Sequence, residues 1–597
     1  MRPEVDGGRY PVKRAVGEQV VVEADVFADG HDAVACELLY RFYSDKDWVR
    51  VPMEFRHNDH WRAAFTVEKP GRYQYTLRGW TDPFLTWQRD LEKRQEAGQD
   101  IGIDLRIGSQ LLGSNIESYE EAMKALSPAP PAERITTYEK NLEVAVDPVR
   151  ARFSTWYEMF PRSARGDGRH ATFKDVIARL PYVQEMGFDV LYFPPIHPIG
   201  TTARKGKNNA MRAGPGDVGS PWAIGAAEGG HKAIHPALGT FEDFHELIKQ
   251  AERRNIAIAL DIAFQCSPDH PYVREHPEWF RWRPDGTVQY AENPPKKYQD
   301  IYPFEFDTQA WKELWEELKS IFEFWAGHGV KIFRVDNPHT KAFAFWEWVI
   351  KELKTKNPEL IFLSEAFTRP RVMHKLAKLG FTQSYTYFTW RNHKAELVEY
   401  FTEPAQSPSR EYFRPNLWPN TPDILHETLQ AGGRPAFIVR LVLAATLAAN
   451  YGIYGPAYEL LERLPREPGS EEYLNSEKYE IKRWDLERPD SLSELIGRLN
   501  RIRRENAALQ GDWSLRFHEV DNPQLLVYSK EAGDNLILVA VNLDLHYPQS
   551  GWVDLDFHGL CEVHDLLGGG RWTWTGRRNY VELDPHILPA HVFRVTR

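Results

Sequence analysis

Between residues 150 and 510, short runs of β-branched and aromatic residues alternate with segments in which apolar residues recur every three or four positions. The segment Trp311-Lys-Glu-Leu-Trp-Glu-Glu-Leu318 has this helical spacing. Strands that alternate with helices favour a parallel sheet, and eight such units predict a closed (β/α)₈ TIM barrel. The eight predicted strands are Phe153–Met159, Asp189–Phe193, Ile256–Phe264, Val330–Asp336, Ile361–Ala366, Ser384–Phe388, Tyr412–Leu417 and Tyr451–Tyr454.

Strand-like alternation also occurs on both sides of this barrel region. From about residue 10 to 110, apolar and polar positions alternate, as in Trp61–Val67, and turn signals separate the runs, which predicts an N-terminal β-sandwich at residues 1–110. Residues 111–149 are predicted to form a short helical linker, and residues 511–597 a C-terminal antiparallel β-domain. We therefore expect an α/β chain of 597 residues, with the barrel at 150–510 between two β-domains.

Two predicted connections of the barrel are unusually long, residues 196–240 and residues 265–307. Both contain many Gly, Pro and Lys residues. Long loops in a compact domain are more often functional than structural, and barrels carry their active sites on the loops that follow the strands. We expect substrate-binding residues in both loops.

Composition restricts the partners and the compartment. A net charge of −11 and a pI near 6.1 argue against a nucleic-acid-binding surface. The three cysteines are far apart and odd in number, and no acidic cluster marks a calcium site, so neither a disulfide framework nor a metal is indicated. The first residues lack the apolar core of a signal peptide, and no run approaches membrane-spanning length. We expect a cytoplasmic protein without metal or cofactor.

Two acidic residues end two of the predicted strands, Asp336 and Glu365. A parallel barrel presents such side chains to its active-site face, and a pair of carboxylates there suggests glycoside chemistry. Arg334 lies on the same face of its strand as Asp336, so it can hold that aspartate ionised and leave Glu365 as the proton donor. From the residues alone, the alternative is that these groups form structural ion pairs.

The segment 291–303 supplies amide, ammonium and hydroxyl donors in Asn293, Lys296 and Tyr298, on a backbone stiffened by two prolines. Such donors could converge on the oxygens of a phosphate, and Asn337 could add another. The alternative is a rigid surface loop whose charges face water.

The chain resembles the four signature regions of the α-amylase superfamily, glycoside hydrolase family thirteen. In chain order, these regions contain Asp261, then Arg334 with Asp336, then Glu365, and then Asp423. Longer stretches resemble one branch of this superfamily, the maltose-1-phosphate-dependent α-1,4-glucan maltosyltransferases. These stretches are Phe193–Gly200, Arg204–Asn209, Gln265–His270, Ala291–Pro303 and Asn475–Tyr479.

The resemblance implies a bacterial, α-retaining enzyme of glycogen metabolism that moves maltosyl from maltose 1-phosphate to an α-1,4-glucan acceptor and releases phosphate. It implies that Asp336 is the nucleophile, Glu365 the acid and base, and Asp423 a third acid that distorts the sugar, although the usual His-Asp pair is absent at Asp423. Asn293, Lys296, Tyr298 and Asn337 would bind the donor phosphate. The implied maltosyl contacts are Lys205, Asn209, Gln265, Asp300, Lys478 and Tyr479.

Three other functions stay open, which are glucosyl transfer from glucose 1-phosphate, α-glucan hydrolysis, and a non-catalytic glucan-binding barrel. Gln265 and Cys266 stand where many hydrolases of the superfamily have a sugar-binding histidine, which disfavours a plain amylase. The resembling family usually has a helical insert that helps to form a dimer, whereas here about Gly113–Thr137 stands in its place. A homodimer is therefore an open expectation.

Overall fold

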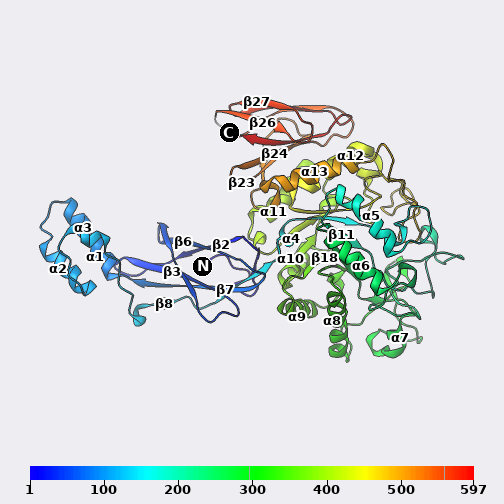
Figure 1. Cartoon of the computed structure of the whole chain (residues 1–597), viewed down its shortest axis with the longest axis horizontal. Coiled ribbons are helices and arrows are strands. Elements are labelled where there is room, and N and C mark those ends of the chain that lie inside the picture. Colours follow the sequence, from blue (N-terminus) through cyan, green and yellow to red (C-terminus); the bar gives the residue numbers. More distant parts are fainter. Residues whose placement is uncertain (295, 557–558, 597) are drawn as a thin grey trace. The chain divides into compact units, whose positions relative to one another are not determined.

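The computed structural model describes residues 1–294, 296–556 and 559–596, and the side chain of Lys296 lies outside the described part. The chain divides into two compact units, Met1–Val149 and Arg150–Arg597. We describe each unit by itself (Figure 1). Among the described residues, no helix has both the length and the apolar character needed to cross a membrane.

The first unit contains two β-sheets whose strands alternate buried and exposed side chains, as in β2, where Val20 and Val22 are fully buried. One sheet has the order β1-β9-β7-β3-β4, with β8 paired to β7, and the other has the order β2-β6-β5. The strands are β1 Val12–Ala15, β2 Gln19–Asp25, β3 Val34–Phe42, β4 Val49–Pro52, β5 Glu54–His57, β6 His60–Thr66, β7 Gly71–Thr81, β8 Thr136–Thr137 and β9 Leu142–Asp147.

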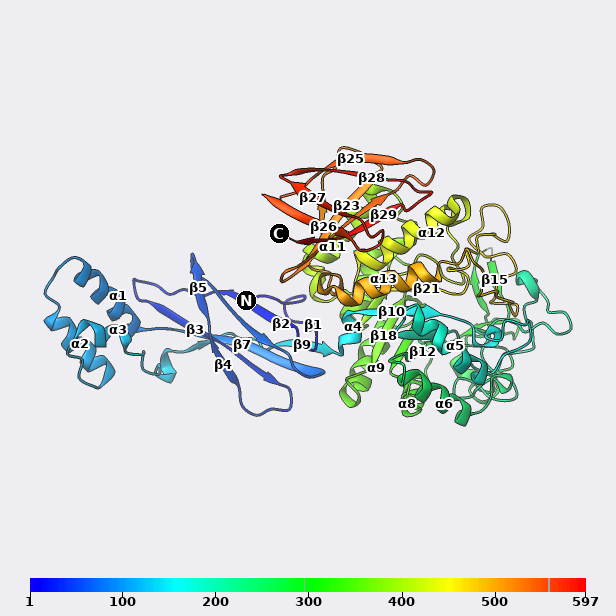
Figure 2. The same cartoon turned by 45° about the horizontal axis from the view of Figure 1, so that its top comes forward.

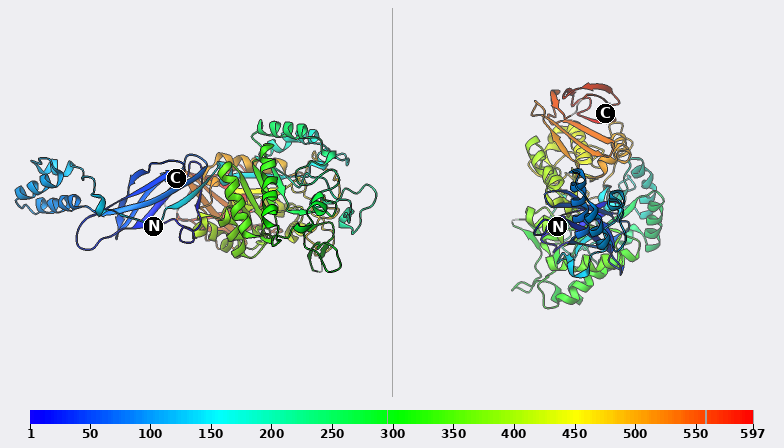
Figure 3. Two further views of the ribbon diagram at one scale, coloured as in Figure 1. Left: turned by 90° about the horizontal axis from the view of Figure 1, so that it is seen from below. Right: turned by 90° about the vertical axis from the view of Figure 1, so that its left-hand side faces the viewer.

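Three helices, α1 Pro83–Glu96, α2 Gly102–Leu112 and α3 Tyr119–Lys124, lie beyond one end of these strands (Figures 2 and 3). They share a small core of their own that includes Phe84, Trp87 and Leu91. This corrects the expected boundaries, because the helices begin at Pro83, residue 110 falls inside α2, and β9 returns to the sheet between β1 and β7. The signals for α1 are local: Asp82 caps it, Pro83 occupies its first turn, and its buried residues have helical spacing.

The second unit contains a closed barrel of parallel strands in the order β10-β11-β12-β17-β18-β19-β20-β21. The predicted fold class is thus confirmed, with β-rich domains before and after the barrel. The strands are β10 Ser154–Glu158, β11 Val190–Phe193, β12 Ala257–Ile262, β17 Ile332–Asp336, β18 Ile361–Glu365, β19 Gln383–Tyr385, β20 Pro415–Leu417 and β21 Asn450–Tyr454. The predicted strand at Tyr412–Leu417 is shorter in the structure because it begins at Pro415, a residue tolerated as the first of a strand.

Amphipathic helices surround the barrel and cover its strands, as α8 does with Leu314, Leu318 and Ile321 fully buried. The barrel helices are α4 Val149–Arg152, α5 Phe173–Glu185, α6 Phe241–Glu252, α8 Trp311–Gly327, α9 Phe343–Lys356, α10 Pro370–Leu379, α11 Lys394–Gln406, α12 Glu427–Leu447 and α13 Ser493–Glu505.

The long connection at 265–307 has structure of its own. It contains α7 Pro271–Glu275 and two small antiparallel pairs, β13 Gln265–Cys266 with β16 Tyr302–Pro303 and β14 Ala291–Asn293 with β15 Lys296–Tyr298. The connection at 194–240 contains only short 3₁₀ turns within its described length. Both begin at the C-terminal ends of barrel strands, where they can border a site.

The C-terminal strands form a six-stranded sheet, β22-β23-β24-β29-β26-β27, and a separate pair, β25 with β28. Their shared core includes Leu538, Val563 and Phe593, and the hydroxyls of Thr446 on α12 and Tyr528 on β23 lie 2.6 Å apart, which joins this domain to the barrel. The strands are β22 Arg516–His518, β23 Leu525–Ala532, β24 Asn535–Asn542, β25 Gln549–Asp554, β26 Leu560–Asp565, β27 Arg571–Thr575, β28 Arg578–Leu583 and β29 Ala590–Thr596.

Candidate active site

The barrel interior positions a ring of polar side chains at the C-terminal ends of its strands. The apolar interior includes Trp156, Ala259, Ile332 and Leu363. Because side chains alternate along a strand, a residue two places further on points to the same side. The residues that follow at this spacing and end the interior are Glu158, Asp261, Arg334, Asp336 and Glu365.

Asp336 and Glu365 are direct register partners on the neighbouring strands β17 and β18. Parallel neighbours lie roughly 4.8 Å apart, so two inward side chains in register meet at the same height. Strand pairing therefore brings the two predicted catalytic carboxyls side by side. A retaining pair needs its carboxyl groups about 5 to 5.5 Å apart, a spacing that this register can provide.

Arg334 connects these acids. Its Nη1 donates to Asp261 Oδ2 and to Asp336 Oδ1, each at 2.8 Å, and its Nη2 lies 3.5 Å from Glu365 Oε1. Burial alone would lower the pKa of Arg334, but the surrounding acidic groups raise it well above its usual value. Asp261 also accepts a hydrogen bond from the Tyr192 hydroxyl at 2.6 Å. Asp261 thus holds the guanidinium in place between the other two carboxyls.

Glu365 has the environment of a proton donor. Burial raises its pKa from 4.5 to about 8; Arg334 opposes this change and Asp336 adds to it. The backbone N–H of Asn337 donates to Glu365 Oε2 at 3.1 Å. Asn337 can aim this N–H because it adopts the left-handed conformation, with φ of 42°, that asparagine tolerates better than most residues. Its side-chain amide donates to Asp336 Oδ2 at 3.4 Å.

Asp423, the third predicted acid, forms an ion pair with Lys478, whose Nζ also lies 4.7 Å from the centroid of the Trp222 ring. Burial acts to lower the pKa of Lys478, but Asp423 raises it above the usual value, so this lysine stays charged. Lys478 was expected to contact the sugar. In the structure its first partner is Asp423, because the segment after β21 brings it back over the barrel end.

Two predicted sugar contacts, Gln265 and Lys478, lie at Trp222, and three others interact electrostatically with one another or with Lys478. Gln265 Nε2 donates to the Trp222 carbonyl at 3.3 Å. Burial raises the pKa of Asp300, and the charges of Lys205 and Lys478 oppose that change. Asp300 and Lys478 in turn affect the pKa of Tyr479, which burial raises to about 12. Asn209 instead donates to Glu472 at 3.3 Å.

The predicted phosphate loop forms the hairpin β14–β15, in which Asn293 and Lys296 are register partners. Asn293 is exposed and Tyr298 is half-buried. Within the described residues, neither makes a hydrogen bond to Asp336 or Glu365. The side chain of Lys296 lies outside the described residues, so this part of the predicted site stays a prediction.

Sequence reasoning missed two charged groups of this site. Lys341 is one; burial lowers its pKa, the charges of Asp336 and Glu365 act in the opposite direction, and its Nζ donates to the Asn337 carbonyl at 3.4 Å. Its Nζ donates to Thr340 Oγ1 at 2.9 Å. Glu158 is the other, and it ends the first barrel strand as Asp336 ends the fourth. Applying the strand-end rule to every predicted strand would have found Glu158.

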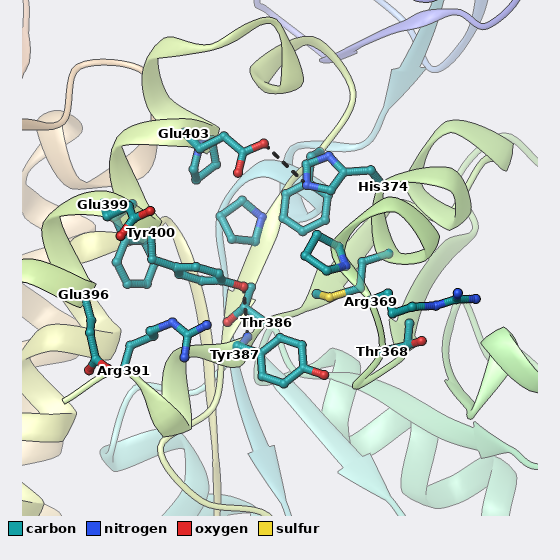
Figure 4. A pocket seen from close by; sticks show the side chains of 16 residues that line it. Thr368, Arg369, His374, Thr386, Tyr387, Arg391, Glu396, Glu399, Tyr400 and Glu403 are labelled. Carbon is teal, nitrogen blue, oxygen red and sulfur yellow. Dashed lines mark hydrogen bonds and ion pairs between the residues drawn. The ribbon is translucent and has the colours of Figure 1, made fainter.

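A cavity of about 620 Å³ lies between α10 and α11, and the first residue that lines it is Thr368, three residues after Glu365 (Figure 4). The backbone N–H of Tyr387 donates to the Tyr400 hydroxyl at 2.9 Å, and His374 Nε2 lies 3.6 Å from Glu403. None of the predicted site residues lines this cavity. It is therefore separate from the carboxylate ring.

Within the described chain, the residues with metal-like spacing are His231, Cys266 and His270, all buried. The Tyr272 N–H donates to His270 Nδ1, which assigns the proton of that ring to Nε2. His270 Nε2 then donates to His231 Nδ1 at 3.0 Å, and His231 Nε2 donates to the Ala263 carbonyl at 2.9 Å. Every ring nitrogen has a matched partner, so these histidines are explained as a hydrogen-bonded part of the loop core.

The closed barrel with its ring of carboxyls defines an α-amylase-type protein, and comparison with known proteins agrees. Residues 158–342 match the family model of the α-amylase catalytic domain. Two solved α-amylases share this fold. The enzyme from Thermotoga neapolitana has a TM-score of 0.58 and 18% identity, over 75% of this chain and 100% of its own. The enzyme from Geobacillus thermoleovorans has a TM-score of 0.59 and 16% identity, over 75% of this chain and 99% of its own. At that identity they show the fold alone.

Two further models match, "Alpha-1,4-glucan:maltose-1-phosphate maltosyltransferase, domain N/S" at residues 1–158 and "GLGE, C-terminal" at 517–595. Two relatives carry the name alpha-1,4-glucan:maltose-1-phosphate maltosyltransferase. The protein from Chlorobaculum tepidum is 52% identical to this chain, over 99% of this chain and 95% of the relative. The protein from Methylacidiphilum infernorum is 50% identical, over 100% of this chain and 95% of the relative. The chain belongs to the α-1,4-glucan:maltose-1-phosphate maltosyltransferase family, which confirms the resemblance found in its sequence.

Proposed function

We propose that this enzyme transfers a maltosyl group from maltose 1-phosphate to the non-reducing end of an α-1,4-glucan, with retention at the anomeric carbon and release of phosphate. The observation that carries the proposal is the register pair Asp336 and Glu365, bridged by Arg334, in a chain about half identical to maltosyltransferases along its whole length.

In the first step, a carboxylate oxygen of Asp336 attacks the anomeric carbon while the bond from that carbon to the phosphate oxygen breaks. Arg334 donates to this carboxylate at 2.8 Å and holds it in position for the attack. Glu365 gives its proton to the departing phosphate oxygen, and the raised pKa of Glu365 keeps that proton available at neutral pH. The products are a β-glycosyl ester on Asp336 and free phosphate.

In the second step, the acceptor 4-hydroxyl attacks the same carbon and the ester bond to Asp336 breaks. Glu365, now ionised, takes the proton of that hydroxyl and returns to its starting state. Each step inverts the anomeric carbon, so the two together retain its configuration. Asp423 acts on the sugar hydroxyls, and Lys478 holds its carboxylate in position.

Cations and amides near the reacting carbon bind the donor phosphate in this proposal. Asn337 follows the nucleophile directly, and Lys341 Nζ donates to the Asn337 carbonyl at 3.4 Å. Asn293, Lys296 and Tyr298 of the β14–β15 hairpin complete the set. Because the chain carries a net charge of −11, a dianionic donor needs such a local group of donors.

The second sugar ring of the donor binds next to Trp222, which Gln265 and Lys478 contact. Lys205, Asp300 and Tyr479 complete this subsite, with Asn209 at its edge. Lys205 and Asp300 are almost fully buried, at 4% and 2% exposure. Opposite charges held this far from water offer strong, fixed partners for sugar hydroxyls. This subsite favours maltosyl over glucosyl transfer.

Phosphate release separates this function from the alternatives. The enzyme is incubated with glycogen and either maltose 1-phosphate or glucose 1-phosphate, with Asp336→Asn as the inactive control. We expect phosphate from maltose 1-phosphate, in equal amount to the maltosyl units added. Phosphate from glucose 1-phosphate at a similar rate would support the glucosyl function, reducing sugar without phosphate would support hydrolysis, and neither product would support a binding protein.

For the assembly we propose a homodimer in the cytoplasm. On α2, Ile103, Ile107 and Leu111 are 64%, 42% and 38% exposed and recur every four residues, so they form an apolar stripe on one face. A second copy of this stripe would cover it. Ile107→Glu should convert a dimer to a monomer in light scattering, whereas a monomeric wild type would contradict the proposal.

A further inference from the structure

Glu158 belongs to the same layer of the barrel as the catalytic acids. It is two residues after Trp156, whose ring packs in the apolar interior, so the Glu158 side chain also points inward. In register it pairs with Tyr192 on one side and Tyr454 on the other. Tyr192 is the residue whose hydroxyl holds Asp261. Glu158 therefore ends β10 within the ring that surrounds Arg334.

Its carboxyl differs from the structural buried acids near this end of the barrel. Glu477 accepts from the Tyr454 hydroxyl at 2.6 Å and from Trp484 Nε1 at 3.2 Å, and Glu459 accepts from two tyrosine hydroxyls. The Glu158 side chain lies in a residue that is only 2% exposed, yet its carboxyl makes no hydrogen bond or ion pair within the described residues; only its backbone is hydrogen-bonded. A buried carboxyl without a partner costs stability, so a structural role does not explain it.

The charge balance of the ring determines the protonation of Glu158. Arg334 already contacts Asp261, Asp336 and Glu365, and Asp423 is paired with Lys478. Burial raises the pKa of Glu158 well above its usual value; Arg334 opposes this, and Asp261, Asp423 and Glu365 add to it. Within the described residues Glu158 forms no ion pair with a cation, and this environment favours its neutral form.

We infer that Glu158 is an additional substrate-binding residue of the maltosyl site, a neutral acid that exchanges hydrogen bonds with a hydroxyl of the reacting sugar from the β10 side. A protonated carboxyl offers one O–H donor and an acceptor oxygen, which matches a hydroxyl that also donates and accepts. The inference rests on the proposed function, and it adds β10 to the strands that hold the reacting ring.

Three variants test it. Glu158→Gln stays neutral and keeps a donor and an acceptor, Glu158→Leu has similar size and neither, and Glu477→Leu serves as the control for a structural acid. We expect Glu158→Gln to keep kcat/KM for maltose 1-phosphate within about threefold of wild type. Glu158→Leu should lose roughly ten- to hundredfold, the effect of leaving a buried sugar hydroxyl unpaired.

Thermal melting separates the loss of a sugar contact from a loss of folding stability. Glu158→Leu should melt at or above the wild-type temperature because it removes a buried carboxyl that has no hydrogen-bond partner. Glu477→Leu should melt at a lower temperature because the Tyr454 hydroxyl and Trp484 Nε1 lose their acceptor. A Glu158→Leu variant with full activity, or one that melts as low as Glu477→Leu, would overturn the inference. If Glu158→Gln and Glu158→Leu lose kcat/KM for maltose 1-phosphate equally, Glu158 does not act as a neutral acid.

Maltose binding without any donor keeps this test independent of the proposed reaction. Calorimetry should show maltose affinity within about threefold of wild type in Glu158→Gln and at least about tenfold weaker in Glu158→Leu. If wild-type enzyme releases no phosphate from maltose 1-phosphate but maltose affinity follows this order, the proposed function fails and the inference for Glu158 stands. Equal affinities in all variants would reject the Glu158 contact.

Discussion

Raising the pH should switch off the first step of the reaction through one group, Glu365. Burial and the nearby Asp336 place its pKa at about 8, despite the opposing charge of Arg334. The departing phosphate needs the proton of Glu365, so kcat/KM for maltose 1-phosphate should be level near pH 7 and fall about tenfold per pH unit above about 8. The donor's own phosphate ionises near pH 6, which leaves the range from 7 to 10 to the enzyme.

A donor whose leaving group needs no proton provides the comparison. Phosphate release is measured from pH 7 to 10 with maltose 1-phosphate, and fluoride release with maltosyl fluoride, at one fixed acceptor concentration. The fluoride reaction should lose far less activity over this range. Glu365→Gln should show a slow but level profile with maltose 1-phosphate, because its amide does not titrate in this range.

Glu365 also makes the stability of the fold depend on pH. Glu365 loses its proton near pH 4.5 when unfolded and near pH 8 when folded, so the unfolded state binds fewer protons between these values. Stability therefore falls as pH rises from about 4.5 to about 8, by up to about 5 kcal/mol for this group. Glu365→Gln lacks this loss of stability. Its denaturant midpoint, compared with that of wild type, should therefore rise between pH 5 and pH 9.

Two results would refute the reasoning. If kcat/KM for maltose 1-phosphate stays level to pH 10, Glu365 is not the proton donor or its environment does not raise its pKa. If both donors lose activity equally, the fall reflects folding or binding, and circular dichroism at each pH shows which.

Three further predictions concern other parts of the site. Asp336→Ala should abolish transfer with an unchanged circular dichroism spectrum, and in Glu365→Ala with maltosyl fluoride a glycosyl adduct should accumulate on Asp336; mass spectrometry that finds the adduct elsewhere contradicts the assignment. Lys296→Ala should reduce use of maltose 1-phosphate about ten- to hundredfold and use of maltosyl fluoride far less, measured as kcat/KM, and equal losses would assign Lys296 to structure. Maltose 1-phosphate should exceed glucose 1-phosphate by at least about a hundredfold in kcat/KM, and Lys478→Ala should shrink that ratio; an unchanged ratio would remove Lys478 from the second sugar subsite.

The amino-acid sequence alone predicted the barrel, its flanking β-domains and the acids that we propose for catalysis. Each barrel strand is a short local run of β-branched and aromatic residues, and an acid at the end of such a run has a defined place in a parallel barrel. Local signals also marked α1, with Asp82 as its cap and Pro83 in its first turn. They were overlooked because the strand pattern before them was extended too far.

Tertiary structure decided how these residues meet. The register of β17 with β18 sets Asp336 beside Glu365, and the register of β12 with β17 sets Arg334 beside Asp261. The return of the chain after β21 joins Lys478 to Asp423, and the inward face of β10 adds Glu158 to the ring. A sequence pattern shows where each strand ends, but register and closure depend on hydrogen bonds and packing between segments far apart in the chain. For that reason the raised pKa of Glu365, which sets its chemistry, is a property of the folded barrel.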